Sequence, residues 1–264
     1  MNFQRIKFFL SRYLLKHPVY MLTYVFTYFL KDFSFKVHFY SQEEIIKLLK
    51  EGRSLIRLGD GDIATIHLGL KNAYHTPNKN IRKMLDTPVK KYDLNSPYIL
   101  SVPKFINVSN IELHKIGKFN VWLPVKVMFL LRFNKQASYM DAHNFYYDNY
   151  FDTIIAPIFK DKKIICITNK KTIDKQSKNK NLPWKDIFYI ETPEYDALLA
   201  YDNIASNIKK EINKYKPEDL VLFFAMGPVG KYMIYEFSKK GYQGIDIGKV
   251  AEVMFTGESI EYMI

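Results

Sequence analysis

The order of apolar runs and polar, helix-period segments along this chain predicts strands alternating with helices. Six short runs rich in β-branched, aliphatic or aromatic residues predict strands at residues 54–58, 98–102, 162–168, 187–190, 220–224 and 244–247. The runs at 162–168 and 220–224 are apolar without alternation, which is typical of strands buried on both faces of a sheet.

The segments between these runs carry helix signals. Ser41 and Glu44 form a capping box before a helix that Gly52 ends. Further helices are expected at residues 63–70, 80–85, 111–133 and 196–215, and a last one ends at residue 237. Pro124 is expected to bend or divide the longest of them, and the lysine-rich stretch 169–181 is expected to be a loop. Together the elements predict a Rossmann-like α/β fold, a mostly parallel sheet flanked by helices.

Residues 1–40 are basic and rich in aromatic side chains, and we expect them to form a helical appendage to the domain at 41–264. Their most apolar run, residues 19–30, is shorter than the roughly 20 residues that a membrane-spanning helix needs. No cleavage site of signal-peptide type is present. Two interpretations stay open: an interfacial helix on an anionic membrane, or a helical hairpin packed on the domain or in an oligomer interface.

Composition narrows the class of protein. The chain has 264 residues and 48% hydrophobic content, which is enough for a sizeable core. Its 39 Lys and Arg against 27 Asp and Glu give a net charge of +12, which favours nucleic acid, anionic lipid or a phosphate-bearing substrate as a neighbour. The single cysteine, Cys166, rules out a disulfide framework and indicates a reducing, cytoplasmic compartment.

Candidate chemistry begins where the first strand ends, in the sequence Arg-Leu-Gly-Asp-Gly-Asp at residues 57–62. We expect a loop here, because glycine permits positive φ and close approach of the backbone to a ligand. Two carboxylates at i and i+2, Asp60 and Asp62, offer hard oxygen ligands to Mg²⁺ or Mn²⁺ and so to a diphosphate. Asp-Gly-Asp is also a common turn sequence, so the motif alone leaves a purely structural turn open.

A second glycine turn, Gly-Pro-Val-Gly-Lys at residues 227–231, follows the strand at 220–224. Backbone N–H groups at a helix N-terminus, together with a nearby lysine, form an anion site. The segment lacks both the dinucleotide-binding and the P-loop pattern, so neither is predicted. A tight turn without a ligand stays open here too.

The first motif resembles the Arg-Phe-Gly-Asp-Gly-Glu signature of the GT-D glycosyltransferases, a bacterial family that builds surface glycans. Residues 224–231 and 241–248 are similar to the Gly-Pro-Thr-Ala-Lys and Gly-Tyr-x-x-x-Asp-Ile-Gly segments of that family, in the same order and at a matching separation. The resemblance implies an enzyme that moves a sugar from a nucleotide diphosphate sugar, with UDP favoured, to a bacterial surface-glycan acceptor. Capsule, lipopolysaccharide and glycoprotein are the acceptor classes that it implies.

The resemblance also assigns residues. Asp60 and Asp62 are the expected catalytic pair, and they are the ligands of a metal ion if one binds. Donor binding is expected from Arg57, Gly59, Gly61, Gly227, Pro228, Lys231, Asp246 and Lys249. On the acceptor side, Asp141 or His143 is a candidate acid or base. The expected location is the cytoplasm, peripherally on the inner face of the cell membrane, where a lipid-linked acceptor would lie.

Two positions depart from the family pattern. Many relatives have His where this chain has Lys249, and Glu where it has Asp62. A requirement for Mn²⁺ or Mg²⁺ is therefore open. Either the ammonium of Lys249 supplies charge that a metal would otherwise bring, or the site is degenerate.

Two rival functions from other classes stay open. One is a catalytically inactive, membrane-associated partner in glycan assembly that keeps the fold. The other is a basic nucleic-acid-binding protein, although the lysines are scattered and no binding motif is present, so nucleic acid is not an expected partner. Assembly into an oligomer is also left open by the sequence.

Overall fold

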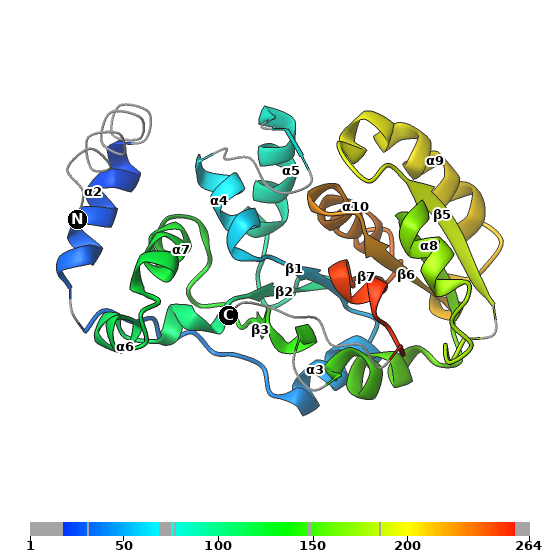
Figure 1. Ribbon diagram of the computed structural model, residues 1–264, viewed down its shortest axis with the longest axis horizontal. Helices are drawn as coiled ribbons and strands as arrows, with labels where there is room; N and C mark the ends of the chain where they lie inside the picture. The colour runs from blue at the N-terminus through cyan, green and yellow to red at the C-terminus, as the bar shows by residue number, and fades with distance from the viewer. Residues whose placement is uncertain are drawn as a thin grey trace.

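The computed structural model of the protein is built on one parallel sheet with helices on both of its faces (Figure 1). It describes residues 18–30, 32–68, 75–76, 78–146, 149–184 and 186–256. Within these ranges seven strands follow the order β3-β2-β1-β7-β6-β4-β5, and every neighbouring pair is parallel. They are β1 (Ser54–Arg57), β2 (Tyr98–Val102), β3 (Met140–Asp141), β4 (Lys163–Asn169), β5 (Ile187–Thr192), β6 (Leu220–Ala225) and β7 (Gly244–Asp246). The Rossmann-like α/β fold predicted from the sequence is confirmed.

Helices connect these strands. The α-helices of the described residues are α2 (Pro18–Phe29), α3 (Gln42–Lys50), α4 (Asp60–Leu68), α5 (Lys79–Lys90), α6 (Asn110–Lys115), α7 (Phe119–Arg132), α8 (Lys170–Gln176), α9 (Tyr201–Ile212) and α10 (Pro228–Ser238). Shorter helical turns are η2 (Lys104–Asn107), η3 (Asn144–Tyr146), η4 (Phe151–Ile155), η5 (Ala156–Phe159), η6 (Ala197–Ala200), η7 (Pro217–Asp219) and η8 (Gly248–Glu252). The predicted capping box is present at α3, where the Ser41 side chain accepts from the Glu44 N–H and Glu44 accepts from the Ser41 N–H.

Each face of the sheet contributes side chains to its own hydrophobic core, because successive side chains of a strand point to opposite faces. Helices α5, α7, α9 and α10 cover the first face, and α3 with η4 and η5 covers the second. Phe224 packs in the first core, and Phe223, its neighbour in β6, packs in the second. The apolar run at 220–224 is therefore buried on both sides, as its lack of alternation predicts.

Strand β7 occupies the middle of the sheet, although it comes last in the chain. Its Ile245 pairs with Leu55 of β1 on one side and with Phe223 of β6 on the other. Neighbouring strands lie about 4.8 Å apart, so the ends of β1 and β6 are separated by only about 10 Å. Segments far apart in the sequence are thereby brought to one edge.

Two local expectations are wrong. The stretch 169–181 begins with helix α8, because the side chain of Asn169 accepts a hydrogen bond from the Thr172 N–H at 3.0 Å and caps it. The helix expected over 111–133 is divided at Gly117, which takes a φ of 68°, whereas Pro124 lies inside α7. A glycine in the left-handed conformation ends a helix more completely than this proline does.

One strand was not predicted, and one helix begins later than expected. The two-residue strand β3 has no sequence signal of its own and exists because it pairs with β2. Helix α9 begins at Tyr201, later than the expected residue 196, since Asp196 takes a φ of 50° and the short turn η6 follows it.

The described part of the N-terminal appendage, residues 18–30 and 32–40, contains helix α2, which packs on α7. The buried Asn110 amide donates hydrogen bonds to the carbonyls of Thr27 at 2.9 Å and Leu30 at 2.8 Å. The ammonium of Lys126, also buried, donates to the carbonyl of Phe33 at 2.9 Å. These bonds fix the end of α2 to the body of the protein, while the domain division at residue 40 stays a prediction. None of the described helices has the length and apolar content needed to cross a bilayer.

Candidate active site

A pocket of about 510 Å³ lies at the edge of the sheet where the strands end. Six strands contribute residues at or just beyond their carboxyl ends: Arg57 from β1, Ala142 after β3, Asn169 from β4, Pro193 after β5, Ala225 from β6 and Asp246 from β7. Helices α4, α7 and α10 supply further walls. Open parallel sheets place ligand sites at these ends, so the fold itself positions the pocket.

Arg57 is one of two buried cations that line this pocket, with a relative exposure of 5%, and Lys231 is the other. Its guanidinium carbon lies 4.4 Å from the centroid of the Phe145 ring and 5.2 Å from that of Tyr146. Its Nη2 donates to the Tyr146 hydroxyl at 3.4 Å. Among the described residues its Nε and Nη1 atoms find no hydrogen-bond partner. A buried guanidinium with free donors is costly unless an anion reaches it.

Lys231 joins the two glycine turns. Its Nζ lies 3.0 Å from Oδ2 of Asp246 and 3.5 Å from Oδ2 of Asp62. Burial disfavours its charged form, but the nearby Asp246 and Asp62 outweigh this effect and raise the pKa of Lys231. Burial also raises the pKa of Asp62 more than Lys231 lowers it. With Arg57, these groups form a nearly neutral cluster of two cations and two carboxylates.

The Asp-Gly-Asp sequence forms the first turn of α4, not the expected loop. Side chains two positions apart on a helix do not face each other. Asp62 turns inward, where its Oδ2 accepts a hydrogen bond from the Gly59 N–H at 3.1 Å, whereas Asp60 is exposed at the rim of the pocket. Because of the helix, the two carboxylates have different surroundings: that of Asp62 is hydrogen-bonded inside the protein, and that of Asp60 is exposed.

The second glycine turn forms the N-terminus of α10. Gly227 takes φ 65° and ψ −147°, a conformation that only glycine adopts readily, and Pro228 then starts the helix. Both residues line the pocket. The positive end of the helix dipole therefore adds to the cationic character of this wall.

The opposite wall is aromatic. Trp122 of α7 stacks on Phe105, with ring centroids 4.6 Å apart, and the edge of the His143 ring meets Trp122 at 5.6 Å. Nδ1 of His143 lies 3.3 Å from Oδ1 of Asp141. His143, Trp122 and Tyr146 line the pocket, so an imidazole beside the Asp141 carboxylate belongs to the same pocket as the charged cluster.

The model of the family described as "Glycosyltransferase GT-D fold" matches residues 55–253. This chain belongs to the GT-D family. It is a glycosyltransferase, and the resemblance noted in its sequence motifs is confirmed.

Solved structures of domain of unknown function 1792 share the fold of this chain. "A New Glycosyltransferase (DUF1792) from Streptococcus sanguinis" has a TM-score of 0.70 at 16% identity, over 87% of this chain and 88% of that one. A structure of domain of unknown function 1792, described as having a distinct glycosyltransferase fold, gives 0.67 at 17% identity, over 89% and 84%. Its selenomethionine counterpart gives 0.68 at 18%, over 88% and 84%. No curated protein matches the chain.

The residues predicted for catalysis and donor binding all line this pocket: Arg57, Gly59, Asp60, Gly61, Asp62, Gly227, Pro228, Lys231, Asp246 and Lys249. Of the two acceptor-side candidates, His143 lines it and Asp141 is not among its lining residues. Their roles stay predictions. Sequence reasoning missed Lys118, Asn169 and Glu194, which also line it. Asn169 and Glu194 follow predicted strands, so the rule that parallel strands end at one edge could have found them.

The predicted metal ligands, Asp60 and Asp62, both line the pocket, but only Asp62 belongs to its buried ion pairs. The ammonium of Lys231 bridges the carboxylates of Asp62 and Asp246, so it holds the position that a metal ion between them would take. Asp60 is exposed at the rim of the pocket. Within the described ranges no three His, Cys, Asp or Glu side chains form a group that could hold a metal. The residues present do not fit a metal site built by the protein alone.

Gly248 tests how tightly Arg57 is held in this GT-D pocket. A Cβ at Gly248 would lie 2.6 Å from Arg57 Nη2, and its φ of 48° disfavours other residues. We expect Gly248→Ala to lower the free energy of unfolding by about 1–3 kcal/mol, measured by urea unfolding. Gly61→Ala is the matched control, because nothing lies within 4 Å of a Cβ added at Gly61. The free energy of unfolding of the Gly61→Ala protein should not fall. Equal stability of the Gly248→Ala protein and the unsubstituted protein would contradict this account of Arg57.

Proposed function

We propose that this glycosyltransferase moves a sugar from a UDP-sugar to a bacterial surface-glycan acceptor such as capsule, lipopolysaccharide or glycoprotein. The observation that carries the proposal is the buried guanidinium of Arg57, whose Nε and Nη1 atoms have no partner among the described residues. A diphosphate has the charge and the acceptor oxygens that these donors require. The N-terminus of α10 lies beside the same pocket and favours the same ligand.

The donor's diphosphate is the leaving group of the proposed reaction. As the bond between the sugar carbon and the diphosphate oxygen breaks, negative charge grows on that oxygen. Fixed donors aimed at this charge lower the barrier, and here they are Arg57 and the first turn of α10. Asp62 and Asp246 act indirectly, because they hold Lys231 in place. Asp60, exposed at the rim, is placed to accept hydrogen bonds from the hydroxyls of the donor sugar.

His143 is the proposed base on the acceptor side. Asp141 lies at Nδ1 of its ring, which leaves Nε2 to take the proton of the acceptor hydroxyl. The acceptor oxygen then bonds to the sugar carbon as the diphosphate leaves. The aromatic neighbours Trp122 and Tyr146 provide apolar faces for sugar rings.

We further infer that the enzyme works at the cytoplasmic face of the cell membrane. Nucleotide sugars and lipid-linked glycan acceptors meet there. The net charge of +12 supports attraction to the anionic lipid of that face.

Arg57→Gln tests the donor site. Charge-assisted hydrogen bonds contribute about 1.5–3 kcal/mol, so UDP should bind roughly 10- to 100-fold more weakly, as measured by calorimetric titration. Arg53→Gln is the control, because Arg53 precedes the other end of β1 and donates to the Leu94 carbonyl at 2.8 Å. Unchanged UDP affinity in the Arg57→Gln protein would remove the main support for the proposal.

His143→Asn tests the proposed base. Loss of general-base catalysis should slow sugar transfer by about 10²–10⁴-fold while UDP affinity stays the same. His114→Asn is the control, because His114 stacks on Phe119 with ring centroids 3.8 Å apart and is not among the residues that line the pocket. Transfer at the normal rate in the His143→Asn protein would show that another group accepts the proton.

The cation bridge made by Lys231 gives a prediction about metals. Because Lys231 already holds the space between Asp62 and Asp246, UDP should raise the melting temperature equally in excess EDTA and in excess MnCl₂. A thermal-shift series measures this directly. A UDP-dependent rise seen only with Mn²⁺ would mean that the metal reaches the pocket together with the diphosphate.

A further inference from the structure

Helix α2 has apolar side chains around its whole circumference and no charged residue. Tyr20 and Met21 are buried, on the face that packs against the body of the protein. Val19, Leu22, Phe26 and Phe29 recur at helical spacing on another face and are 64%, 71%, 65% and 72% exposed. A helix that is apolar on every side is normally buried on every side. The exposed second face of α2 therefore indicates a surface that binds a partner.

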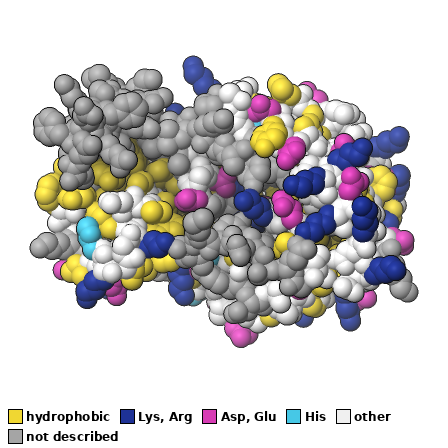
Figure 2. Space-filling model, viewed as in Figure 1, with side chains coloured by type: hydrophobic (Ala, Val, Ile, Leu, Met, Phe, Trp, Pro, Cys, Tyr) yellow, Lys and Arg dark blue, Asp and Glu magenta, His cyan; other side chains and the backbone are white. Residues whose placement is uncertain are grey.

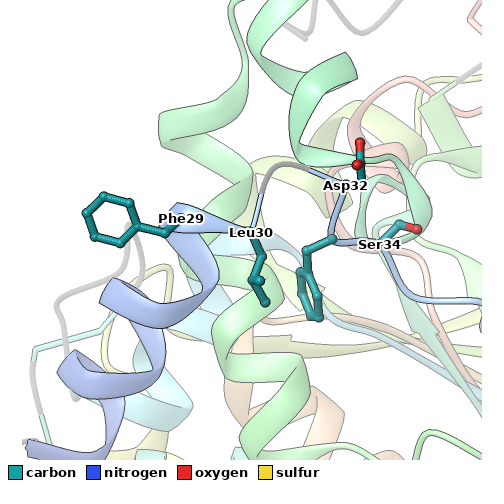
Figure 3. Close-up of a pocket in the computed structure, with 5 residues that line it drawn as sticks. Phe29, Leu30, Asp32 and Ser34 are labelled. Atoms are coloured by element: carbon teal, nitrogen blue, oxygen red, sulfur yellow. The ribbon is translucent and has the colours of Figure 1, made fainter.

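The exposed face is not the result of loose attachment. The Asn110 amide and the Lys126 ammonium bind the carbonyls at the end of α2, as described above. A hollow of about 550 Å³ at this end is lined by residues that include Phe29 and Phe33. Figure 3 shows Phe29 projecting outward from the last turn of the helix. Helix α2 therefore presents its apolar stripe as a fixed surface.

Neighbouring elements extend this surface toward the pocket. Ile116, between α6 and α7, is 53% exposed, and Val121 of α7 is 49% exposed. Figure 2 shows hydrophobic side chains gathered at the end of the molecule that carries α2, α6 and α7. Val121 and Lys118 also line the pocket, so the helix that supports α2 is one wall of the site.

The charge of the segment before α2 and the length of α2 indicate which partner covers the exposed face. Residues 1–17, which lead directly into α2, contain Arg5, Lys7, Arg12 and Lys16 and no acidic residue. Each basic residue near an anionic bilayer contributes about 1 kcal/mol to binding. With 12 residues α2 is about 18 Å long, too short to cross the hydrocarbon core but suited to lie in the interface.

We propose that the exposed stripe of α2, formed by Val19, Leu22, Phe26 and Phe29, docks into the interface of an anionic lipid bilayer. Docking holds α7 and its wall of the pocket next to the membrane surface. The docking gives the proposed membrane location a surface, and delivery of a lipid-linked acceptor to this wall rests on the proposed sugar transfer.

Co-sedimentation of the full chain with vesicles tests the proposal. We expect binding to phosphatidylglycerol vesicles and at least tenfold weaker binding to phosphatidylcholine vesicles. The double variant Leu22→Glu and Phe26→Glu should lose at least tenfold in partitioning to phosphatidylglycerol, since both sites are exposed and the core is untouched. Leu199→Glu is the matched control: Leu199 is 90% exposed in η6, before α9 at the other edge of the sheet, and its binding should not change.

Three results would overturn the proposal. The first is no binding of the unsubstituted protein to phosphatidylglycerol, and the second is undiminished binding of the double variant. The third is a dimer in solution that the double variant converts to monomer, because a second copy would then cover the stripe. The thermal shift by UDP, measured without vesicles, should be the same in the double variant. Loss of vesicle binding by the double variant with that shift retained supports the docking. If the unsubstituted protein shows the UDP shift but does not bind phosphatidylglycerol vesicles, the docking is wrong and the proposed donor site still stands.

Discussion

The ammonium of Lys231 lies between the carboxylates of Asp246 and Asp62, and this buried ion pair ties together three elements. Lys231 comes from the first turn of α10, Asp62 from the first turn of α4, and Asp246 from the end of β7. Removal of one member of a buried ion pair typically costs about 3–5 kcal/mol, because the remaining charge is left without a partner. The shape of the pocket thus depends on an interaction that also balances most of its charge.

Because the charge of Lys231 is already balanced by two carboxylates, Arg57 is the group in the pocket to which an anion would bind. The two carboxylates offset Lys231 and part of the field of Arg57. Nε and Nη1 of Arg57 have no hydrogen-bond partner among the described residues, and Arg57 lines the pocket together with the N-terminus of α10. Phe145 and Tyr146 hold the guanidinium from one side, and Gly248 leaves room for it on another. A rigid cationic site of this kind stabilises charge that appears during a reaction without having to reorganise.

The sequence predicts an element correctly where its signal lies in residues that are neighbours along the chain. The unbroken apolar run of β6 and the capping box of α3 depend on neighbouring residues, and both were predicted correctly. The position of β7 depends on its pairing with β1 and β6, which no local pattern encodes. The start of α4 at Asp60 was missed because a glycine within Asp-Gly-Asp suggests a loop, whereas the backbone N–H of Gly59 and the inward turn of Asp62 stabilise the first helical turn. Motifs parted along the chain were placed in one pocket because parallel strands end at one edge.

The central claim is that the pocket between β1 and α10 holds the diphosphate of a nucleotide sugar. A crystal structure of the protein with UDP tests this claim most directly. We predict a diphosphate within hydrogen-bond distance of Nε or Nη1 of Arg57 and beside Gly227, with the Lys231 ion pairs intact. UDP bound outside this pocket, or bound in it with Arg57 still without an anionic partner, would contradict the account.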